Sequence, residues 1–208
     1  MSESQYTVSD VMTHTVVAVG SAAPFKEIVE LLDQWKVSAL PVLAGEGRVV
    51  GVVSEADLLP KEEFRDGDEA TGEAGERLKA GALTAGELMS TPAVTVHADA
   101  SLAEAARIMA RRHVKRLPVV DGVGMLQGVV SRSDLLKVFL RPDSEIADEI
   151  RGSVLTHLPI TTGLEVSVTE GVVTLSGALP ERGLVPVVAR AVRAVEGVVD
   201  VQLDLTHR

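Results

Sequence analysis

The order of apolar and polar residues in the first part of the chain indicates four regular elements. A short apolar run at Val16–Val19 is typical of a strand. The next apolar residues recur at spacings of three and four, which predicts a helix; they are Phe25, Ile28, Val29 and Leu32. Two further apolar runs, Ala39–Leu43 and Val49–Val53, flank a glycine-bearing turn and predict a hairpin.

The same order returns 77 residues later and defines an internal repeat. The second copy has apolar runs at Ala93–Val96, Leu117–Val120 and Met125–Val130, and a helical stripe of Leu102, Ala105, Ala106, Ile108 and Met109. The offset holds without a gap from Met12 to Leu59, and 18 of the 48 aligned positions are identical. Two copies predict a pseudo-symmetric pair rather than a solenoid, each copy running strand, helix, strand, strand, helix.

A different pattern follows Pro142. A helical stripe of Ile146, Ile150, Val154 and Leu155 precedes an alternating strand at Leu164, Val166 and Val168. A turn and a second strand occupy Glu170–Gly177, a second helical stripe runs from Leu184 to Val195, and Val198, Val201, Leu203 and Leu205 belong to a last strand. The order helix, strand, strand, helix, strand predicts a small third domain.

The whole chain is therefore predicted to be of the α/β (α+β) class, with two repeats and a C-terminal domain. We place the first repeat at residues 1–60, the second at 85–141 and the C-terminal domain at 142–208. Residues 61–84 are rich in Glu, Gly and Ala and have the composition of an acidic linker.

Each repeat ends in the same nine residues with two letters changed: GVVSEADLL at Gly51–Leu59, the first phrase, and GVVSRSDLL at Gly128–Leu136, the second phrase. Serine three residues before aspartate is the spacing of a helix capping box. A hydroxyl and a carboxylate on the first turn of a helix also suit the two hydroxyls of a ribose. Both interpretations remain open from spacing alone, and they are compatible.

Composition and charge narrow the function classes. The chain has no cysteine, which excludes disulfides, thiolate metal sites and cysteine nucleophiles, and its net charge of −10 argues against nucleic-acid binding. The N-terminus lacks a signal-peptide pattern, and no apolar run is long enough to cross a bilayer, so we expect a cytoplasmic protein. Phosphate-loop and zinc-protease motifs are missing and the five histidines are scattered, so we expect no catalytic residues, no metal and no enzyme activity.

The paired repeats resemble a tandem of CBS domains, the Bateman module, over about residues 8–140. The resemblance is carried by the openings D-V-M (Asp10–Met12) and E-L-M (Glu87–Met89), by V-S-A-L-P-V and V-K-R-L-P-V, and by the two phrases. It implies binding of an adenosine-containing effector between the repeats (AMP, ADP, ATP or S-adenosylmethionine), no required cofactor, and a homodimer.

The resemblance also implies roles for particular residues. Serine and aspartate of the phrases hold the ribose, which assigns Ser54, Asp57, Ser131 and Asp134. Apolar residues of the openings and of the Leu-Pro-Val strands flank the base, which assigns Met12, Met89, Pro41 and Pro118. Basic residues just before Leu-Pro reach phosphate, which assigns Lys115 and Arg116, with His113 and Arg132 nearby.

The two repeats differ in charge at these positions. The counterparts of His113, Lys115, Arg116 and Arg132 in the first repeat are Lys36, Ser38, Ala39 and Glu55. Because phosphate favours fixed cations and disfavours a nearby carboxylate, we expect the better site around Ser131 and Asp134. A solvated strand edge is the alternative interpretation of Lys115 and Arg116.

The tail resembles a BON domain, on the strength of V-x-V-x-E-G-V-V-T-L-S-G and G-V-V-D-V. That family has been linked to phospholipid or membrane-associated binding, yet this tail has ten acidic and five basic residues, so anionic headgroups should repel it. Two functions follow. The first is a non-catalytic sensor that binds an adenosine ligand and signals to the BON domain or a partner. The alternative is an interaction or envelope-associated protein whose CBS pair is a structural dimeriser and whose BON domain binds lipid or a partner.

Overall fold

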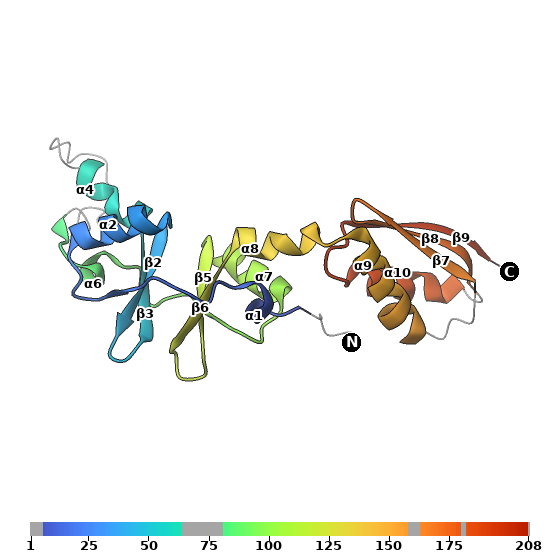
Figure 1. Cartoon of the computed structure of the whole chain (residues 1–208), viewed down its shortest axis with the longest axis horizontal. Helices are drawn as coiled ribbons and strands as arrows, with labels where there is room; N and C mark the ends of the chain where they lie inside the picture. Colours follow the sequence, from blue (N-terminus) through green and yellow to red (C-terminus); the bar gives the residue numbers. More distant parts are fainter. Residues whose placement is uncertain (1–5, 64–80, 158–162, 180–181, 208) are drawn as a thin grey trace. The chain divides into compact units, whose positions relative to one another are not determined.

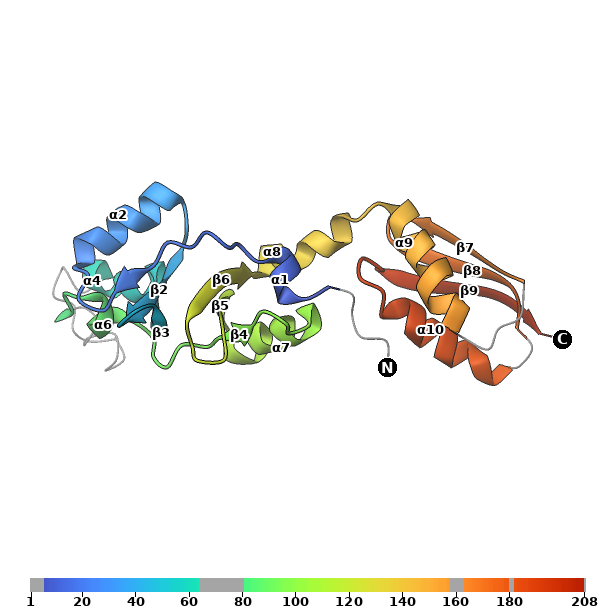
Figure 2. The same cartoon turned by 60° about the horizontal axis from the view of Figure 1, so that its bottom comes forward.

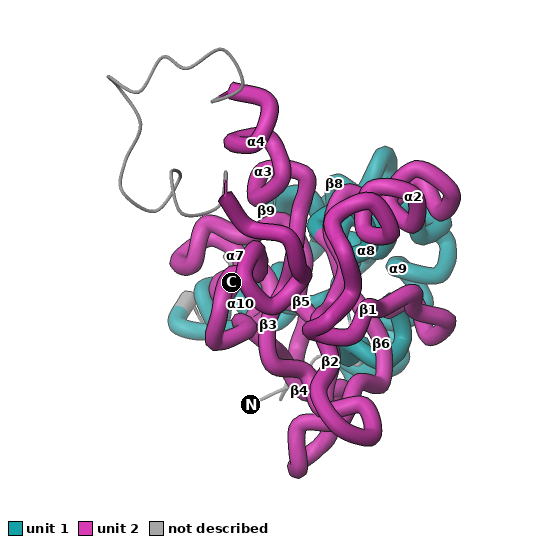
Figure 3. Tube along the Cα trace, turned by 90° about the vertical axis from the view of Figure 1, so that its left-hand side faces the viewer, with its two compact units in different colours: residues 1–11, 132–208 teal, residues 12–131 magenta. Residues whose placement is uncertain are grey.

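The computed structural model describes residues 6–63, 81–157, 163–179 and 182–207 (Figure 1). Its strands form three sheets of three strands each. The chain divides into two compact units, one of residues 12–131 and the other of residues 1–11 with 132–208 (Figure 3). The mixture of helices and small mixed sheets confirms the predicted fold class.

The first repeat contains one sheet with the order β1-β2-β3. Strands β1 and β2 are parallel, and β2 and β3 form an antiparallel hairpin. Its elements are α1 (Val8–Val11), β1 (Val19–Gly20), α2 (Phe25–Trp35), β2 (Ala39–Ala44), β3 (Arg48–Ser54), α3 (Glu55–Leu58) and α4 (Pro60–Glu63).

The second repeat has the same elements in the same order, with the sheet β4-β5-β6. These are α6 (Ala85–Leu88), β4 (Val96–His97), α7 (Leu102–Arg112), β5 (Arg116–Val120), β6 (Leu126–Ser131), α8 (Arg132–Leu136) and the 3₁₀ helix η1 (Lys137–Leu140). Helices α2 and α7 both end on a residue in the left-handed conformation, Lys36 (φ 52°) and His113 (φ 55°), which are equivalent positions of the repeat.

Strands β1 and β4 begin later than the apolar runs at Val16–Val19 and Ala93–Val96 suggested. The residues just before them pair with the other repeat: Thr13 forms a bridge with Val129, and Ser90 forms one with Val52. Helix α6 follows the same exchange, because its buried residues belong to the hydrophobic core of the first repeat. The opening segment of each repeat therefore pairs with the sheet of the other repeat.

Glycine makes this exchange possible. A Cβ at Gly128 would lie 2.9 Å from the carbonyl oxygen of Thr13, and one at Gly51 would lie 3.0 Å from that of Ser90. Only a residue without a side chain allows the opening segment of the other repeat to approach so closely. The glycine that opens each phrase is thus explained by packing between the repeats.

The two hairpins meet at equivalent positions. Arg48 forms a bridge with Met125, the residue that the offset of 77 places opposite it. The amide of Val49 donates to the carbonyl of Gly124, and the amide of Leu126 donates to that of Gly47, both at 3.0 Å. A residue that pairs with its own repeat equivalent lies beside the pseudo-twofold axis of residues 12–131.

The C-terminal domain packs two helices on one face of the sheet β7-β8-β9 (Figure 2). Its elements are α9 (Asp143–Glu149), the π-helical turn η2 (Ile150–Val154), η3 (Leu155–His157), β7 (Leu164–Thr169), β8 (Val172–Leu179), η4 (Arg182–Leu184), α10 (Val185–Arg193) and β9 (Asp200–His207). The core joins Ile146 and Ile150 to Leu175 and Val192. Strand β9 does not include Val198, because Gly197 turns the chain with φ 93° just before it.

Part of the predicted linker takes regular structure. Residues 60–63 form α4, and Lys61 donates to the carbonyl oxygen of Ala82 at 2.6 Å. Residues 64–80, the middle of the predicted linker, lie outside the described residues. Over the parts of the chain that are described, no helix is both long and apolar enough to span a bilayer.

Candidate functional site

A cavity of about 430 Å³ lies between the two repeats, within residues 12–131. Four segments line it: the start of β2, the end of β3 with α3, the run after the second opening, and the turn from α7 into β5. Its lining residues are Ser38, Ala39, Val52, Ser54, Glu55, Ala56, Asp57, Leu59, Ser90, Pro92, Ala93, Val94, His113, Val114, Lys115 and Arg116. We call it the phrase cavity, because the first phrase forms one wall.

The serine and aspartate of the first phrase form the capping box that their spacing predicted. The amide and the hydroxyl of Ser54 donate to Oδ2 of Asp57 at 2.8 and 2.7 Å. The other carboxylate oxygen, Oδ1, accepts a long hydrogen bond from the hydroxyl of Ser90 at 3.4 Å. Asp57 is only 7% exposed, and it presents a buried carboxylate to the cavity at the start of a helix.

The cations of the cavity come from the second repeat. His113, Lys115 and Arg116 line it, and Arg116 spans the repeats. Its Nη2 donates to the hydroxyl of Ser38 at 2.6 Å, and its Nη1 to the carbonyl of Ala39 at 3.4 Å. Ala39 is the repeat equivalent of Arg116, so this guanidinium also lies beside the pseudo-twofold axis. A fixed cation in this position is suited to an anionic group.

The apolar wall was not among the residues that the sequence singled out. Pro92, Ala93 and Val94 face the cavity together with Val52 of β3. They belong to the opening run of the second repeat and reach the first phrase only because the opening segments are exchanged. A pairing between Ser90 and Val52 leaves no signal in the sequence, since neither residue type is distinctive.

Four predicted base-flanking residues do not line the phrase cavity. Met12 and Met89 pack against Gly128 and Gly51 of the opposite repeat. Pro41 and Pro118 lie buried inside β2 and β5, opposite Val52 and Val129. A proline is accepted there because the parallel partners pair only from Val42 and Val119 onward. Their contribution to a site remains a prediction.

The second phrase has the same place in its repeat as the first, between the last strand of the hairpin and the helix that follows it. Ser131 ends β6, and Arg132 and Asp134 lie in α8. Oδ1 of Asp134 accepts from Nζ of Lys137 at 2.7 Å, with the two side chains 12% and 58% exposed. The carboxylate of the second phrase is therefore paired with a cation one helical turn further along.

The structure groups the predicted residues differently from our expectation. His113, Lys115 and Arg116 were expected to serve the second phrase, but they line the cavity of the first, beside Ser54 and Asp57. The sequence pattern assigned each cation to the phrase of its own repeat, whereas the cavity is built across the pseudo-twofold axis. Glu55, which counted against phosphate in the first repeat, now faces three basic side chains.

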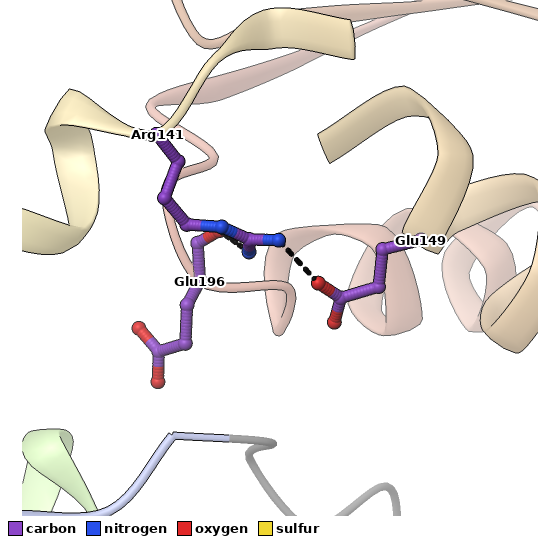
Figure 4. Close-up of polar contacts among 3 residues, drawn as sticks. All are labelled: Arg141, Glu149 and Glu196. Atoms are coloured by element: carbon purple, nitrogen blue, oxygen red, sulfur yellow. Dashed lines mark hydrogen bonds and ion pairs between the residues drawn. The ribbon is translucent and has the colours of Figure 1, made fainter. Parts of the chain in front are cut away.

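A second polar cluster joins the end of the second repeat to the C-terminal domain (Figure 4). Arg141 donates to the carbonyl of Glu196 at 2.6 Å and to the carboxylate of Glu149 at 2.8 Å. The side chains of Arg141 and Glu149 are only 11% and 15% exposed, and the ring of Tyr6 lies 5.0 Å from the guanidinium. Among the residues that the structure describes, no group of three or more His, Asp or Glu side chains is placed to hold a metal ion.

Family models match most of the chain. The CBS domain matches residues 8–61 and 85–141, and the BON domain matches residues 142–207. An uncharacterised protein of Methanocaldococcus jannaschii is 33% identical over 149 residues, which cover 70% of this chain and 35% of that protein. The chloroplastic CBS domain-containing protein CBSX2 of Arabidopsis thaliana is 31% identical over 153 residues, 65% of this chain and 64% of that protein. The chain thus spans less than two thirds of the length of both relatives.

Solved structures show the same architecture. The crystal structure of CBSX2 in complex with AMP superposes with a TM-score of 0.58 at 31% identity, covering 65% of this chain and 97% of the other. The match includes the paired repeats, so the predicted resemblance to a CBS pair is confirmed, as is the BON domain that follows it.

Proposed function

The chain belongs to the CBS-domain family, as a tandem pair followed by a BON domain, and we propose that its pair is a regulatory module for an adenosine-containing ligand. The ligand occupies the phrase cavity, and the module acts by binding, without catalysing a reaction. One observation carries this proposal: a single cavity contains the hydroxyl and carboxylate of one repeat and the cations of the other. The complex of the 31% identical CBSX2 with AMP supports the choice of ligand class.

Each part of the ligand has a counterpart in the cavity. Asp57, held at a helix start by Ser54, accepts hydrogen bonds from the ribose hydroxyls through its carboxylate. The base packs on the apolar run Pro92–Val94, and the phosphate meets Lys115 and Arg116. Charge-assisted hydrogen bonds of this kind are the strong ones in a partly buried site.

We expect removal of one cation to separate phosphate binding from nucleoside binding. Arg116→Met should weaken AMP about tenfold or more, because a hydrogen bond to a charged group contributes about 1.5–3 kcal/mol, while adenosine, which lacks phosphate, should change little. Asp57→Asn should weaken both compounds. Titration calorimetry measures all four combinations, with Arg107→Met as the matched control for an exposed arginine outside the cavity.

Two results would contradict the proposal. One is no binding of AMP, ADP, ATP or S-adenosylmethionine at millimolar concentration. The other is an equal loss of AMP and adenosine affinity in Arg116→Met. Thermal denaturation of each variant checks that the fold is retained, since Arg116 also contacts Ser38 and Ala39.

Ligand binding is proposed to reach the BON domain through the end of the second repeat. Helix α8, η1 and the BON domain belong to one compact unit, and Arg141 fastens that segment to Glu149 and to the carbonyl of Glu196. A segment held in this way transmits a displacement instead of absorbing it. The ligand biases the arrangement only by its difference in affinity between the two states.

We also propose a homodimer formed through the CBS pair. Leu59 and Leu136 close the two phrases at equivalent positions, and they are 56% and 61% exposed. Light scattering should give twice the chain mass, and Leu136→Asp should lower it because a buried charge opposes association. A monomer mass for the wild type at micromolar concentration would contradict the dimer.

A further inference from the structure

Two helices at equivalent places in the repeats carry opposite charge. Helix α2 has three acidic residues and one basic residue, a net charge of −2, whereas α7 has three basic residues and one acidic residue, a net charge of +2. The repeat offset of 77 places α2 on α7 residue for residue. All of these charged side chains are exposed; they are Lys26, Glu27, Glu30 and Asp33 of α2, and Glu104, Arg107, Arg111 and Arg112 of α7.

Several of these charges are not compensated within the chain. Asp33 pairs with Lys36 at the surface, at 2.7 Å. Glu30, Arg107 and Arg111 form no ion pair with any residue that the structure describes. Exposed charges of one sign on one face are available to a second molecule with the opposite sign.

The exposed apolar side chains of the two helices differ in size. Val29 and Trp35 of α2 are 41% and 52% exposed, and Val29 lines a groove of about 580 Å³ between α2 and α3, together with Leu59. The exposed apolar residues of α7 are all alanine: Ala103, Ala106 and Ala110. Because the distance between packed helices depends on the side chains at their contact, a helix with an alanine face can approach such a groove closely.

A twofold homodimer can bring these helices together in two ways. In the parallel arrangement, the first repeat of one copy faces the first repeat of the other, so α2 meets α2 and α7 meets α7. Both contacts then oppose like charges, which costs free energy. In the antiparallel arrangement, the first repeat of each copy faces the second repeat of the other, so α2 meets α7 twice. Acidic side chains then meet basic ones, and the large apolar residues of α2 meet alanine.

We propose that the chain forms the antiparallel homodimer, in which α2 of each copy packs on α7 of the partner subunit. This inference rests on the proposed homodimer and names its orientation and its contact surface. The groove beside Val29 receives the alanine face of the partner's helix, and Glu30 lies near the basic residues of that helix. Raising the salt concentration weakens this dimer, because salt screens the attraction between the two faces.

Cross-linking distinguishes the two orientations. The chain has no cysteine, so a thiol introduced at Val29, or at its repeat equivalent Ala106, is unique. In co-expressed chains with different tags, a short bismaleimide should join Val29→Cys to Ala106→Cys and should join neither variant to itself. Gln127→Cys, at an exposed position of β6, is the control for random collision and should join to none of them. Gel electrophoresis separates the products by their tags.

Charge reversal provides a second measurement. Glu30→Arg should weaken the dimer about tenfold or more, because the change occurs twice in a twofold dimer and places arginine against a basic helix. Adding Arg107→Glu to the same chain should restore the dimer, since opposite charges then face each other again. Glu46→Arg, an exposed reversal in the turn between β2 and β3, should leave the dimer unchanged. Sedimentation equilibrium at low and high salt gives the dissociation constants.

Each other outcome counts against the inference. Cross-linking of either helix variant to itself, or a dimer that salt strengthens, would show the parallel arrangement. A dimer that gives no mixed cross-link would show that another face forms it. No recovery in the double variant, with folding verified by circular dichroism, would show that these charges do not set the orientation. A monomeric wild type would contradict the proposed homodimer itself, and this inference with it.

Discussion

Replacing Gly177 by alanine is expected to destabilise the BON domain by about 4 kcal/mol. Gly177 lies in β8 with φ 125°, a conformation that residues with a side chain rarely adopt. A Cβ there would overlap the carbonyl oxygen of Gly163 and lie 2.9 Å from its carbonyl carbon. Backbone atoms cannot turn aside as a flexible side chain does, so β7 and β8 would have to separate. A loss of this size is a large part of the stability of a small domain.

Gly183→Ala is the matched control, because a Cβ at this position would have no other atom within 4 Å and its φ lies outside the left-handed region. It should leave stability unchanged or raise it slightly, by reducing the freedom of the unfolded chain. Urea unfolding followed by circular dichroism measures both variants. Trp35, the single tryptophan, lies in α2 and reports on the first repeat by fluorescence. An unchanged unfolding midpoint for Gly177→Ala, or an equal loss in Gly183→Ala, would contradict the explanation.

Replacing Arg141 by methionine is expected to destabilise the unit that contains the BON domain by about 3–5 kcal/mol, because it breaks a buried ion pair by removing one partner. The carboxylate of Glu149 is only 15% exposed, and it would lose its cationic donor. The carbonyl of Glu196 would lose the hydrogen bond from Arg141 as well. In denaturant unfolding, this loss should appear as a lower midpoint of the transition in which the BON domain unfolds.

The double variant Arg141→Met with Glu149→Leu separates this cause from a general packing defect. It should recover most of the lost stability, since two apolar side chains replace a buried ion pair at little cost. Arg190→Met is the control, because Arg190 is an exposed arginine of α10 in the same unit, where a surface substitution usually changes stability by about 0.5 kcal/mol or less. If the double variant were no more stable than the single one, the ion pair would not be the reason for the loss.

The order of elements could be predicted from the sequence because burial imposes it. Apolar spacing of three and four located α2, α7 and α10, and apolar runs beside glycine located both hairpins. The repeat supported each assignment, because two segments with the same apolar pattern are expected to form the same elements. The ends of a strand were harder to predict: Val198 is apolar, but the turn at Gly197 keeps it out of β9.

The site could be predicted only in part. The spacing of Ser54 and Asp57 predicted their hydrogen bonds, because both residues lie on one helical turn. The contact of Arg116 with Ser38 could not be predicted, since it joins residues 78 positions apart across the pseudo-twofold axis. The ion pair of Lys137 with Asp134 does have a local signal, because their spacing of three residues is that of a helical ion pair.

The exchange of opening segments has a consequence for how this module can be inherited or engineered. Thr13 completes the sheet that contains Val129, and Ser90 completes the one that contains Val52. A gene fragment encoding one repeat alone would lack the segment that bridges the edge of its sheet, and the first repeat would also lose the core residues of α6, so neither copy is a self-sufficient building block. Recombination can transfer the duplicated pair as a whole into a new protein, whereas a single repeat should fold stably only when a second molecule takes the place of the absent repeat.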